Sequence, residues 1–257
     1  MTRIAVKIAY LGAGYRGSQA QPGLRTVEGD IASDLCAIRR EPGWDPRLRM
    51  ASRTDGMVNA LGNVAAFDAP IEDPFVLLKA LNAVSKGVFY RGFAAVGEDF
   101  NPRHADMREY RYVMRRDGID PDKARECASL FVGEHDFSGF CRADGKSPVL
   151  AIDSIRVSSE GDLMITDFRA RYYLWNMVRR LMAAIAAVGR GDASIGDVEA
   201  ALGGNGVSFG LARPDALTLT RVEYGGIDFI EPEGMFDAKV GEELFKDGIR
   251  RAFFSAL

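Results

Sequence analysis

The chain has 257 residues, of which 47% are hydrophobic and 27% are charged, and its formal net charge is −3. This balance is typical of a folded protein that is long enough to bury a sizeable core. The three cysteines include no Cys-x-x-Cys pair, which argues against a disulfide framework and against a thiolate zinc site.

Three features bear on where the protein works. The odd number of cysteines fits a reducing compartment. The first residues read as a strand and lack the apolar run of a signal peptide. No stretch approaches the roughly 18 uncharged apolar residues of a membrane-spanning helix. We therefore expect a cytoplasmic protein that has no membrane association.

The basic residues are clustered although the net charge is slightly negative. Five arginines and no acid lie within residues 168–191, and five more arginines lie against two acids within residues 101–116. Patches of one sign determine where a polyanion binds, and the planar guanidinium of arginine suits phosphates and bases. The clusters favour nucleic-acid binding, but the arginine codons of a GC-rich genome explain the composition equally well.

The spacing of apolar residues predicts strands and helices in both halves of the chain. In the first half we expect strands at 3–11, 47–52, 62–68 and 88–96 and helices at 26–40 and 73–84. In the second half we expect strands at 108–115, 152–158, 163–170 and 216–224 and helices at 121–131, 175–188, 195–202 and 240–254. Strands and helices mixed in this way predict an α+β fold, with domains 1–100 and 101–257.

Two loops have the composition of a functional site. Gly12, Gly14 and Gly17 predict a loop that another group approaches closely, although a flexible turn explains them as well. No Gly-Lys-Ser/Thr follows them, so this loop is not a P-loop. Asp55 precedes a glycine, as a simple turn former does, but the Arg-Thr pair before it can hold its carboxylate ionised and oriented.

Two further segments combine aromatic or apolar residues with arginine. Tyr110 and Tyr112 alternate along a predicted strand, so they face one way and the neighbouring charges face the other. Such tyrosines are usually core residues, but single-stranded RNA also stacks on them. Arg179 lies among apolar residues of a predicted helix, so it must either extend to solvent or meet a buried carboxylate.

No known metal site or hydrolytic triad can be assembled from the sequence. His104 and His135 are the only histidines, and the acids beside His135 do not converge with it on one ion. No Ser/His/Asp or Cys/His triad is evident, and no second carboxylate pairs with Asp55 as a glycosidase requires. We expect no metal and no cofactor.

Taken together, these segments resemble the tRNA pseudouridine synthase A family from about residue 3 to residue 225. The matching blocks follow in the family's order: Y-x-G-x-x-Y-x-G-x-Q-x-Q-P at 10–22, T-V-E-G at 26–29, R-T-D at 53–55, Tyr110, G-x-H-D-F at 133–137, N-M-V-R at 176–179 and A-L-T-L at 216–219. Ser52 stands where the family usually has glycine, and Gly56-Met57-Val58-Asn59 replaces its Lys-Gly-Val-His run. Leu11 replaces its aspartate, and Thr218 its tyrosine. None of these departures removes a catalytic side chain.

The resemblance implies both a fold and an activity. The fold is α+β, with two α/β half-domains that share a mostly antiparallel sheet and a central catalytic cleft. The activity is isomerisation of uridine to pseudouridine in tRNA, at positions 38–40 of the anticodon stem-loop, without a cofactor. The family works as a homodimer in which tRNA touches both subunits.

The resemblance also implies roles for individual residues. Asp55 is the catalytic nucleophile, Arg179 pairs with it, and Tyr110 stacks on the uracil. The residues expected to contact the substrate are Arg53, Leu217, Gln19, Arg171 and Asn176. Two alternatives stay open: a catalytically silent RNA-binding protein that uses the same cleft, and a Mg²⁺-dependent nuclease, which EDTA would inhibit.

Overall fold

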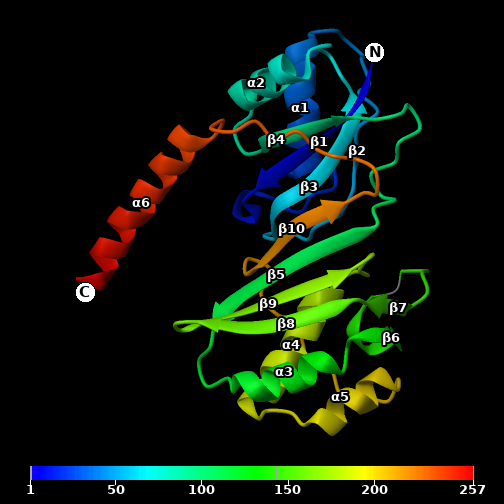
Figure 1. Ribbon diagram of the computed structural model, residues 1–257, viewed down its shortest axis with the longest axis vertical. Coiled ribbons are helices and arrows are strands. Elements are labelled where there is room, and N and C mark those ends of the chain that lie inside the picture. The colour runs from blue at the N-terminus through cyan, green and yellow to red at the C-terminus, as the bar shows by residue number, and fades with distance from the viewer. Residues whose placement is uncertain (1, 143, 257) are drawn as a thin grey trace.

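A single eight-stranded sheet runs through the whole molecule (Figure 1). The computed structural model describes residues 2–142 and 144–256. The strands lie in the order β4-β1-β3-β10-β5-β9-β8, and the short β2 pairs with β3. Every pair is antiparallel except β10 with β3, so the predicted α+β fold with a mostly antiparallel sheet is confirmed.

The strands at one end of the sheet, and the helices beside them, come from the first hundred residues. They are β1 (Arg3–Tyr10), the 3-10 turn η1 (Gly12–Gly14), α1 (Val27–Arg39), β2 (Arg49–Met50), β3 (Asn59–Asp68), α2 (Pro74–Val84) and β4 (Phe89–Ala95). The helix start predicted at Thr26 is confirmed, because its hydroxyl caps α1 by accepting from the Gly29 amide at 3.2 Å. Asp73 caps α2 in the same way, and both helices pack beside this part of the sheet (Figure 1).

The second half of the chain contributes the strands at the other end of the sheet, the strand β10 at its centre, and four helices. Its elements are β5 (Met107–Arg115), α3 (Pro121–Ser129), β6 (Gly133–Asp136), η2 (Ser138–Phe140), β7 (Val149–Ile152), β8 (Ser154–Glu160), β9 (Leu163–Ala170), α4 (Met177–Arg190), α5 (Ile195–Leu202), β10 (Leu217–Glu223) and α6 (Asp237–Ser255). The apolar stripe of α4 includes Leu181, Met182 and Ile185, which are fully buried, so α4 is the main core helix behind this part of the sheet.

Strand β10 lies between the strands of the first half and those of the second half and pairs with both. It runs parallel to β3, with Thr218 opposite Asn59, and antiparallel to β5, with Leu219 opposite Tyr110. A Cβ on Gly62 of β3 would lie 2.5 Å from the Thr220 carbonyl oxygen, so only glycine permits this approach of the backbones. The last strand of the chain is therefore at the centre of the sheet.

Two parts of the second half differ from the sequence-based prediction. The helix expected at 175–188 begins at Met177, because Asn176 adopts a left-handed conformation (φ 62°) that asparagine tolerates. Trp175 thus precedes the helix. The two-stranded sheet of β6 and β7 was not expected, since its four-residue strands are too short to give an alternating pattern.

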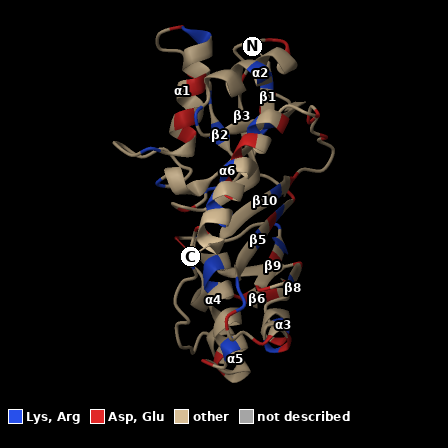
Figure 2. Ribbon diagram, turned by 90° about the vertical axis from the view of Figure 1, so that its left-hand side faces the viewer, with Lys and Arg blue, Asp and Glu red and all other residues tan. Residues whose placement is uncertain are grey.

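Helix α6 projects away from the rest of the molecule (Figure 1), on the side that faces the viewer in Figure 2. The segment before it crosses back to β4, where Ile230 pairs with Phe93. None of the residues of α6 that the structure describes is buried. Despite its length, neither α6 nor any other described helix is apolar enough to cross a membrane.

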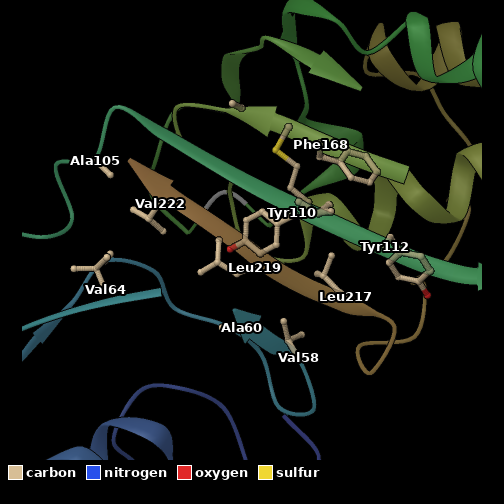
Figure 3. Packing of buried hydrophobic residues seen from close by; sticks show 14 of the residues in the cluster. Val58, Ala60, Val64, Ala105, Tyr110, Tyr112, Phe168, Leu217, Leu219 and Val222 are labelled. Atoms are coloured by element: carbon tan, nitrogen blue, oxygen red, sulfur yellow. The ribbon is translucent and has the colours of Figure 1, made fainter. Parts of the chain in front are cut away.

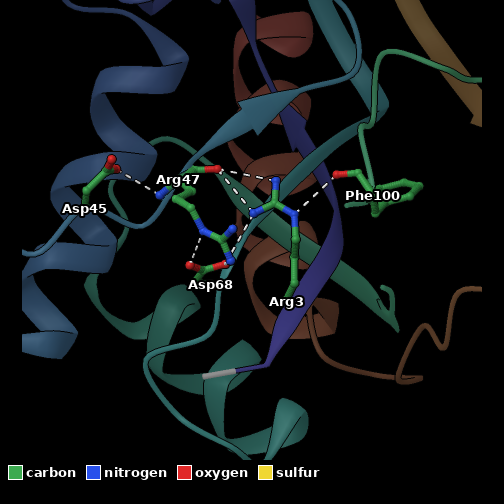
Figure 4. Close-up of polar contacts among 5 residues, drawn as sticks. All are labelled: Arg3, Asp45, Arg47, Asp68 and Phe100. Atoms are coloured by element: carbon green, nitrogen blue, oxygen red, sulfur yellow. Dashed lines mark hydrogen bonds and ion pairs between the residues drawn. The ribbon is translucent and has the colours of Figure 1, made fainter. Parts of the chain in front are cut away.

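A buried ion cluster closes the edge of the first half where β1 begins (Figure 4). Arg3, which is buried, contacts Asp68 at 3.3 Å, and Arg47 contacts the same carboxylate at 2.6 Å. Arg3 also donates to the backbone oxygens of Phe100 and Arg47. Burial acts to raise the pKa of Asp68, but the two guanidinium groups outweigh it, so this pKa lies below its ordinary value.

We expect Asp68→Asn to lower the free energy of unfolding by roughly 3 kcal/mol at pH 7, because it leaves the Arg3 guanidinium buried without a counter-charge. A carboxylate with a depressed folded-state pKa stabilises the protein above its unfolded-state pKa of about 3.9 and loses this effect as the pH falls through the lower folded-state value. The difference between the variants should therefore shrink in acid. Urea unfolding at several pH values measures it.

Asp167→Asn is the matched control for this experiment. Asp167 pairs with Arg111 at 2.7 Å, but both side chains are well exposed, so its loss should change the unfolding free energy by less than about 1 kcal/mol. An equal loss in the two variants would contradict the importance that we assign to burial at Asp68.

Candidate active site

Asp55 lies in the loop between β2 and β3, and the residue before it anchors this loop. Thr54 is buried; its amide donates to the Ser18 hydroxyl at 2.8 Å, and its carbonyl accepts from the Ser18 amide at 3.0 Å. Its hydroxyl is 2.9 Å from that of Tyr10. Because Thr54 points inward, the flanking Arg53 is exposed and Asp55 is partly exposed.

The glycine-rich run of the first loop wraps around this Asp55 loop. A Cβ on Gly12 would lie 2.2 Å from the backbone carbon of Met57. Gly17 has a φ of +118° and faces the Thr54 carbonyl. The group that approaches these glycines is therefore the backbone of the Asp55 loop, and they serve to hold that loop in place.

Arg179 of α4 forms an ion pair with Asp55. Its Nη1 is 3.0 Å from Asp55 Oδ2, and the side chains are 12% and 28% exposed, respectively. Arg179 is itself fixed, since its Nε donates to the Ala212 carbonyl at 2.8 Å and its Nη1 lies 3.4 Å from the Asn176 side-chain oxygen. The sequence predicts that this arginine either extends to solvent or pairs with a carboxylate, and in the structure it pairs with a carboxylate. The pair joins residues 124 positions apart.

The second oxygen of Asp55 also has a partner. The indole Nε1 of Trp175 donates to Asp55 Oδ1 at 3.1 Å. The carboxylate is thus held at both oxygens, by one cation and one neutral donor, and it remains partly open to solvent. Such a carboxylate is oriented to act on a group that approaches from outside.

Tyr110 lies in the middle of β5, beside Leu219 of the central strand (Figure 3). Its side chain is buried, and the ring of Tyr173 packs edge-on against it, with 5.3 Å between centroids. Burial raises the pKa of the Tyr110 hydroxyl; the Arg108 cation opposes this rise, and the Asp55 charge adds to it. Tyr110 therefore offers a ring and a protonated hydroxyl at neutral pH.

The expectation that the charges of this strand face away from the tyrosines was wrong for Arg108. A strand has a period of two, so Arg108 lies on the same face as Tyr110, and it is buried. No acid pairs with it among the described residues, and burial lowers the pKa of its guanidinium. It donates to Ser52 Oγ at 2.9 Å and to the carbonyl oxygens of Arg171, Ala51 and Arg103 at 2.6–3.1 Å.

Through its hydrogen bonds, Arg108 connects three segments of the chain that surround the site. Ser52 and Ala51 lead into the Asp55 loop, Arg103 belongs to the connection between the halves, and Arg171 follows β9. Ser52 stands where the resemblance leads us to expect glycine, and its hydroxyl supplies one of the four acceptors of Arg108. Arg108 thus fixes the Asp55 loop relative to β5.

The residues expected to contact the substrate lie in different settings. Asn176 touches Arg179, and Leu217 is buried at the start of β10, opposite Tyr112. Gln19, Arg53 and Arg171 are exposed. Gln19 follows the serine that anchors Thr54, and Arg171 offers its backbone oxygen to Arg108.

The described residues offer no evident metal centre. Within 2–142 and 144–256, no three His, Cys, Asp or Glu side chains are placed to hold an ion. The ring of His135 lies against Phe137, and its Nε2 is 3.1 Å from the Val132 carbonyl oxygen. The chemistry that this site can support therefore centres on one oriented carboxylate, with a guanidinium and a protonated phenol nearby.

Comparison with known proteins identifies the class of this enzyme. A sequence profile described as tRNA pseudouridine synthase matches residues 127–225, which include Arg179 and Leu217. The tRNA pseudouridine synthase A of Pyrococcus abyssi is 38% identical over 88% of this chain and 86% of its own. Those of Pyrococcus horikoshii and Methanocella arvoryzae are 36% and 38% identical and cover 98% and 90% of this chain and 97% and 88% of their own.

These matches and the mixed sheet define an RNA-modifying isomerase. The chain belongs to the tRNA pseudouridine synthase A family, and it is an enzyme that isomerises uridine in tRNA.

Sequence reasoning missed two residues that hold this site. Trp175 directly precedes the Asn176–Arg179 block, but it was assigned to the helix, where an indole has no defined direction. Arg108 was grouped with the exposed charges, although its spacing of two from Tyr110 was sufficient to place it on the buried face.

We expect Arg108→Lys to lower the free energy of unfolding by about 1–3 kcal/mol, because an ammonium group cannot reach four acceptors that diverge around a guanidinium. The rate of uridine isomerisation should fall as well, since Ser52 leads into the Asp55 loop. Thermal unfolding and a single-turnover assay measure the two effects. Arg111→Lys, on the exposed face of the same strand, should change stability by less than about 0.5 kcal/mol; equal effects at the two positions would contradict the role of Arg108.

Proposed function

We propose that this enzyme converts uridine to pseudouridine at positions 38–40 of the tRNA anticodon stem-loop, with Asp55 as its nucleophile. The observation that carries the proposal is the orientation of the Asp55 carboxylate, which Arg179 and Trp175 hold at separate oxygens in a partly open site. The family supplies the reaction, and the R-T-D and N-M-V-R blocks supply the assignment of Asp55 and Arg179.

The reaction requires a carboxylate but no electron carrier. The N1–C1′ bond of uridine breaks, a C5–C1′ bond forms, C5 loses its proton and N1 gains one. Asp55 attacks either C6 of the uracil or C1′ of the ribose, and it leaves again when the new bond has formed. Atoms and electrons balance without a redox cofactor.

Arg179 and Tyr110 have complementary parts in this proposal. The Arg179 guanidinium pairs with Asp55 Oδ2 at 3.0 Å and so directs the carboxylate for attack. The raised pKa of Tyr110 keeps its hydroxyl protonated, so it acts through its ring, which packs on the uracil, and through an O–H donor.

The target base must leave the helical stack to reach Asp55. We assign Arg53, which is exposed beside Asp55, to the space that the base vacates, and Gln19 and Arg171, which are also exposed, to further contacts with the tRNA. We assign Leu217, which is buried, to apolar contact with the base, and Asn176, whose side-chain oxygen is 3.4 Å from Arg179 Nη1, to holding Arg179. We take residues 1–100 and 101–257 as the two half-domains between which the tRNA lies.

We expect Asp55→Ala and Asp55→Asn to abolish isomerisation while tRNA affinity changes by less than about threefold. Transfer RNA that carries tritium at uracil C5 gives the readout, because the wild-type enzyme releases the label to water. Phosphate contacts supply most of the affinity, and neither substitution removes one.

The same experiment tests the alternatives. Tritium release by Asp55→Ala at the wild-type rate would remove Asp55 from the mechanism. A wild-type protein that binds tRNA without any release would instead be the silent RNA-binding protein, and loss of activity in EDTA would point to a metal-dependent reaction.

We also propose that two copies of the chain associate through α6 into a homodimer, in which tRNA touches both subunits. Six large apolar side chains of α6 are exposed: Val240, Leu244, Phe245, Ile249, Phe253 and Phe254. The helix has acids at Glu242 and Glu243 and arginines at Arg250 and Arg251, so an antiparallel second copy places opposite charges side by side. The free thiols of the chain fit the cytoplasm as the site of the reaction.

The double substitution Leu244→Glu with Ile249→Glu should convert the dimer into a monomer, because it places four carboxylates in the apolar contact between the two helices. Sedimentation velocity measures the change. Val76→Glu is the matched control, since Val76 is a similarly exposed apolar residue of α2 and should leave the dimer intact. A monomeric wild-type protein would contradict the proposal.

A further inference from the structure

The indole of Trp175 is the contact at the active site that neither the resemblance nor the motif accounts for. Its Nε1 is 3.1 Å from Asp55 Oδ1, while Arg179 Nη1 is 3.0 Å from Oδ2. A carboxylate bonded at one oxygen still rotates about its Cβ–Cγ bond. Donors at both oxygens fix its plane.

Other restraints on the Asp55 side chain are few. Thr54 anchors the backbone before Asp55, and after it the amide of Met57, whose backbone is left-handed (φ 72°), donates to the Tyr15 carbonyl at 3.4 Å. The backbone of the loop is therefore anchored on both sides of Asp55, but these contacts do not fix the torsion of its side chain. The direction of its carboxylate depends on the side chains that reach it from the other half of the molecule.

Trp175 is held in place although it is exposed. Its backbone oxygen accepts from the Arg142 amide at 3.0 Å, and the Arg142 guanidinium lies over its ring, 4.7 Å from the centroid. The left-handed Asn176 that follows ends the extended backbone there. Trp175 is 47% exposed, so packing covers only part of the indole. Its direction comes from Arg142 and Asp55.

We propose that Trp175 is a positioning residue of the isomerisation, which orients Asp55 through its indole N–H, and that Arg142 keeps the indole in place. The proposal rests on the proposed function of Asp55. A carboxylate oxygen has two lone pairs, so Oδ1 can accept this bond and still attack. The contribution is geometric, because misalignment of a nucleophile lowers the rate without weakening binding.

An exposed aromatic residue beside an RNA site has a second plausible role, as a surface on which a base stacks. The two roles differ in what they change. A stacking residue contributes through its ring and mainly affects affinity, whereas a positioning residue contributes through its N–H and mainly affects the rate constant of the chemical step.

The test removes the N–H and keeps the ring. Trp44 and Trp175 are the only tryptophans, so a Trp44→Phe protein grown with 3-benzothienylalanine carries the sulfur analogue at position 175 alone. Single-turnover tritium release should fall about tenfold or more relative to Trp44→Phe with natural tryptophan, and the Kd for tRNA should stay within about twofold. Because residue 175 is at the surface, thermal unfolding should not change.

Arg142 supplies the second arm of the test. Arg142→Ala should lower the rate several-fold when residue 175 is tryptophan, and it should have no further effect on the rate with the sulfur analogue, which has no N–H to direct. Arg142→Lys keeps a cation over the ring and should restore most of the rate. An Arg142 that served only as a phosphate contact would lower affinity equally with either residue.

Three results would overturn the inference: a full rate with the sulfur analogue, a loss confined to affinity, or an equal rate effect of Arg142→Ala with both residues at position 175. Asp55→Ala, assayed in parallel, separates this failure from that of the proposed function. If Asp55→Ala is inactive while the sulfur analogue is fully active, only the role of Trp175 is wrong. If Asp55→Ala releases tritium, the proposed function itself fails.

Discussion

The ion pair between Asp55 and Arg179 is the interaction on which the rest of the active site depends. Its members come from the two halves of the chain. Arg179 is also held by the Ala212 carbonyl, and the Asp55 backbone follows the anchored Thr54. A guanidinium that is 12% exposed has lost most of its water, and the carboxylate replaces that water with a directed charge. The two halves must therefore be joined in one geometry for the site to exist.

That geometry comes from the backbone around β10 and from a second buried arginine. The register of β10 against β3 and β5 sets how the halves meet, and Gly62 allows the close approach. Arg108 then connects the start of the Asp55 loop to the far side of the sheet through neutral oxygen atoms. Because these acceptors carry no charge, Arg108 can hold the loop without competing with Arg179 for Asp55.

Much of the secondary structure could be predicted from local patterns, because the signals were of the kind that neighbouring residues provide. Thr26 capped its helix, and the apolar stripe of α4 is buried as its spacing required. The order of the strands could not be predicted in this way. Nothing near Leu217 in the sequence shows that β10 lies between β3 and β5, since that placement depends on pairing with distant segments.

The same limit applied to the active site. The motif blocks pointed to Asp55, Tyr110 and Arg179, and the structure places Arg179 against Asp55. The partners that orient these residues are scattered: Trp175 and Arg108 contribute through directions that arise only when Asn176 turns left-handed and β5 takes its place in the sheet. A sequence pattern records which side chains are present, but the direction of each depends on the fold.

The position of β10 has a consequence for how the protein is made. Its residues are synthesised after those of β3, β5 and α4, yet they lie in the middle of the sheet. Until β10 is synthesised, β3 and β5 lack the strand that joins them in the folded protein, and the sheet that relates Asp55 to Arg179 cannot form. During that period the facing edges of β3 and β5 are open to pairing with other chains, which is a route to aggregation.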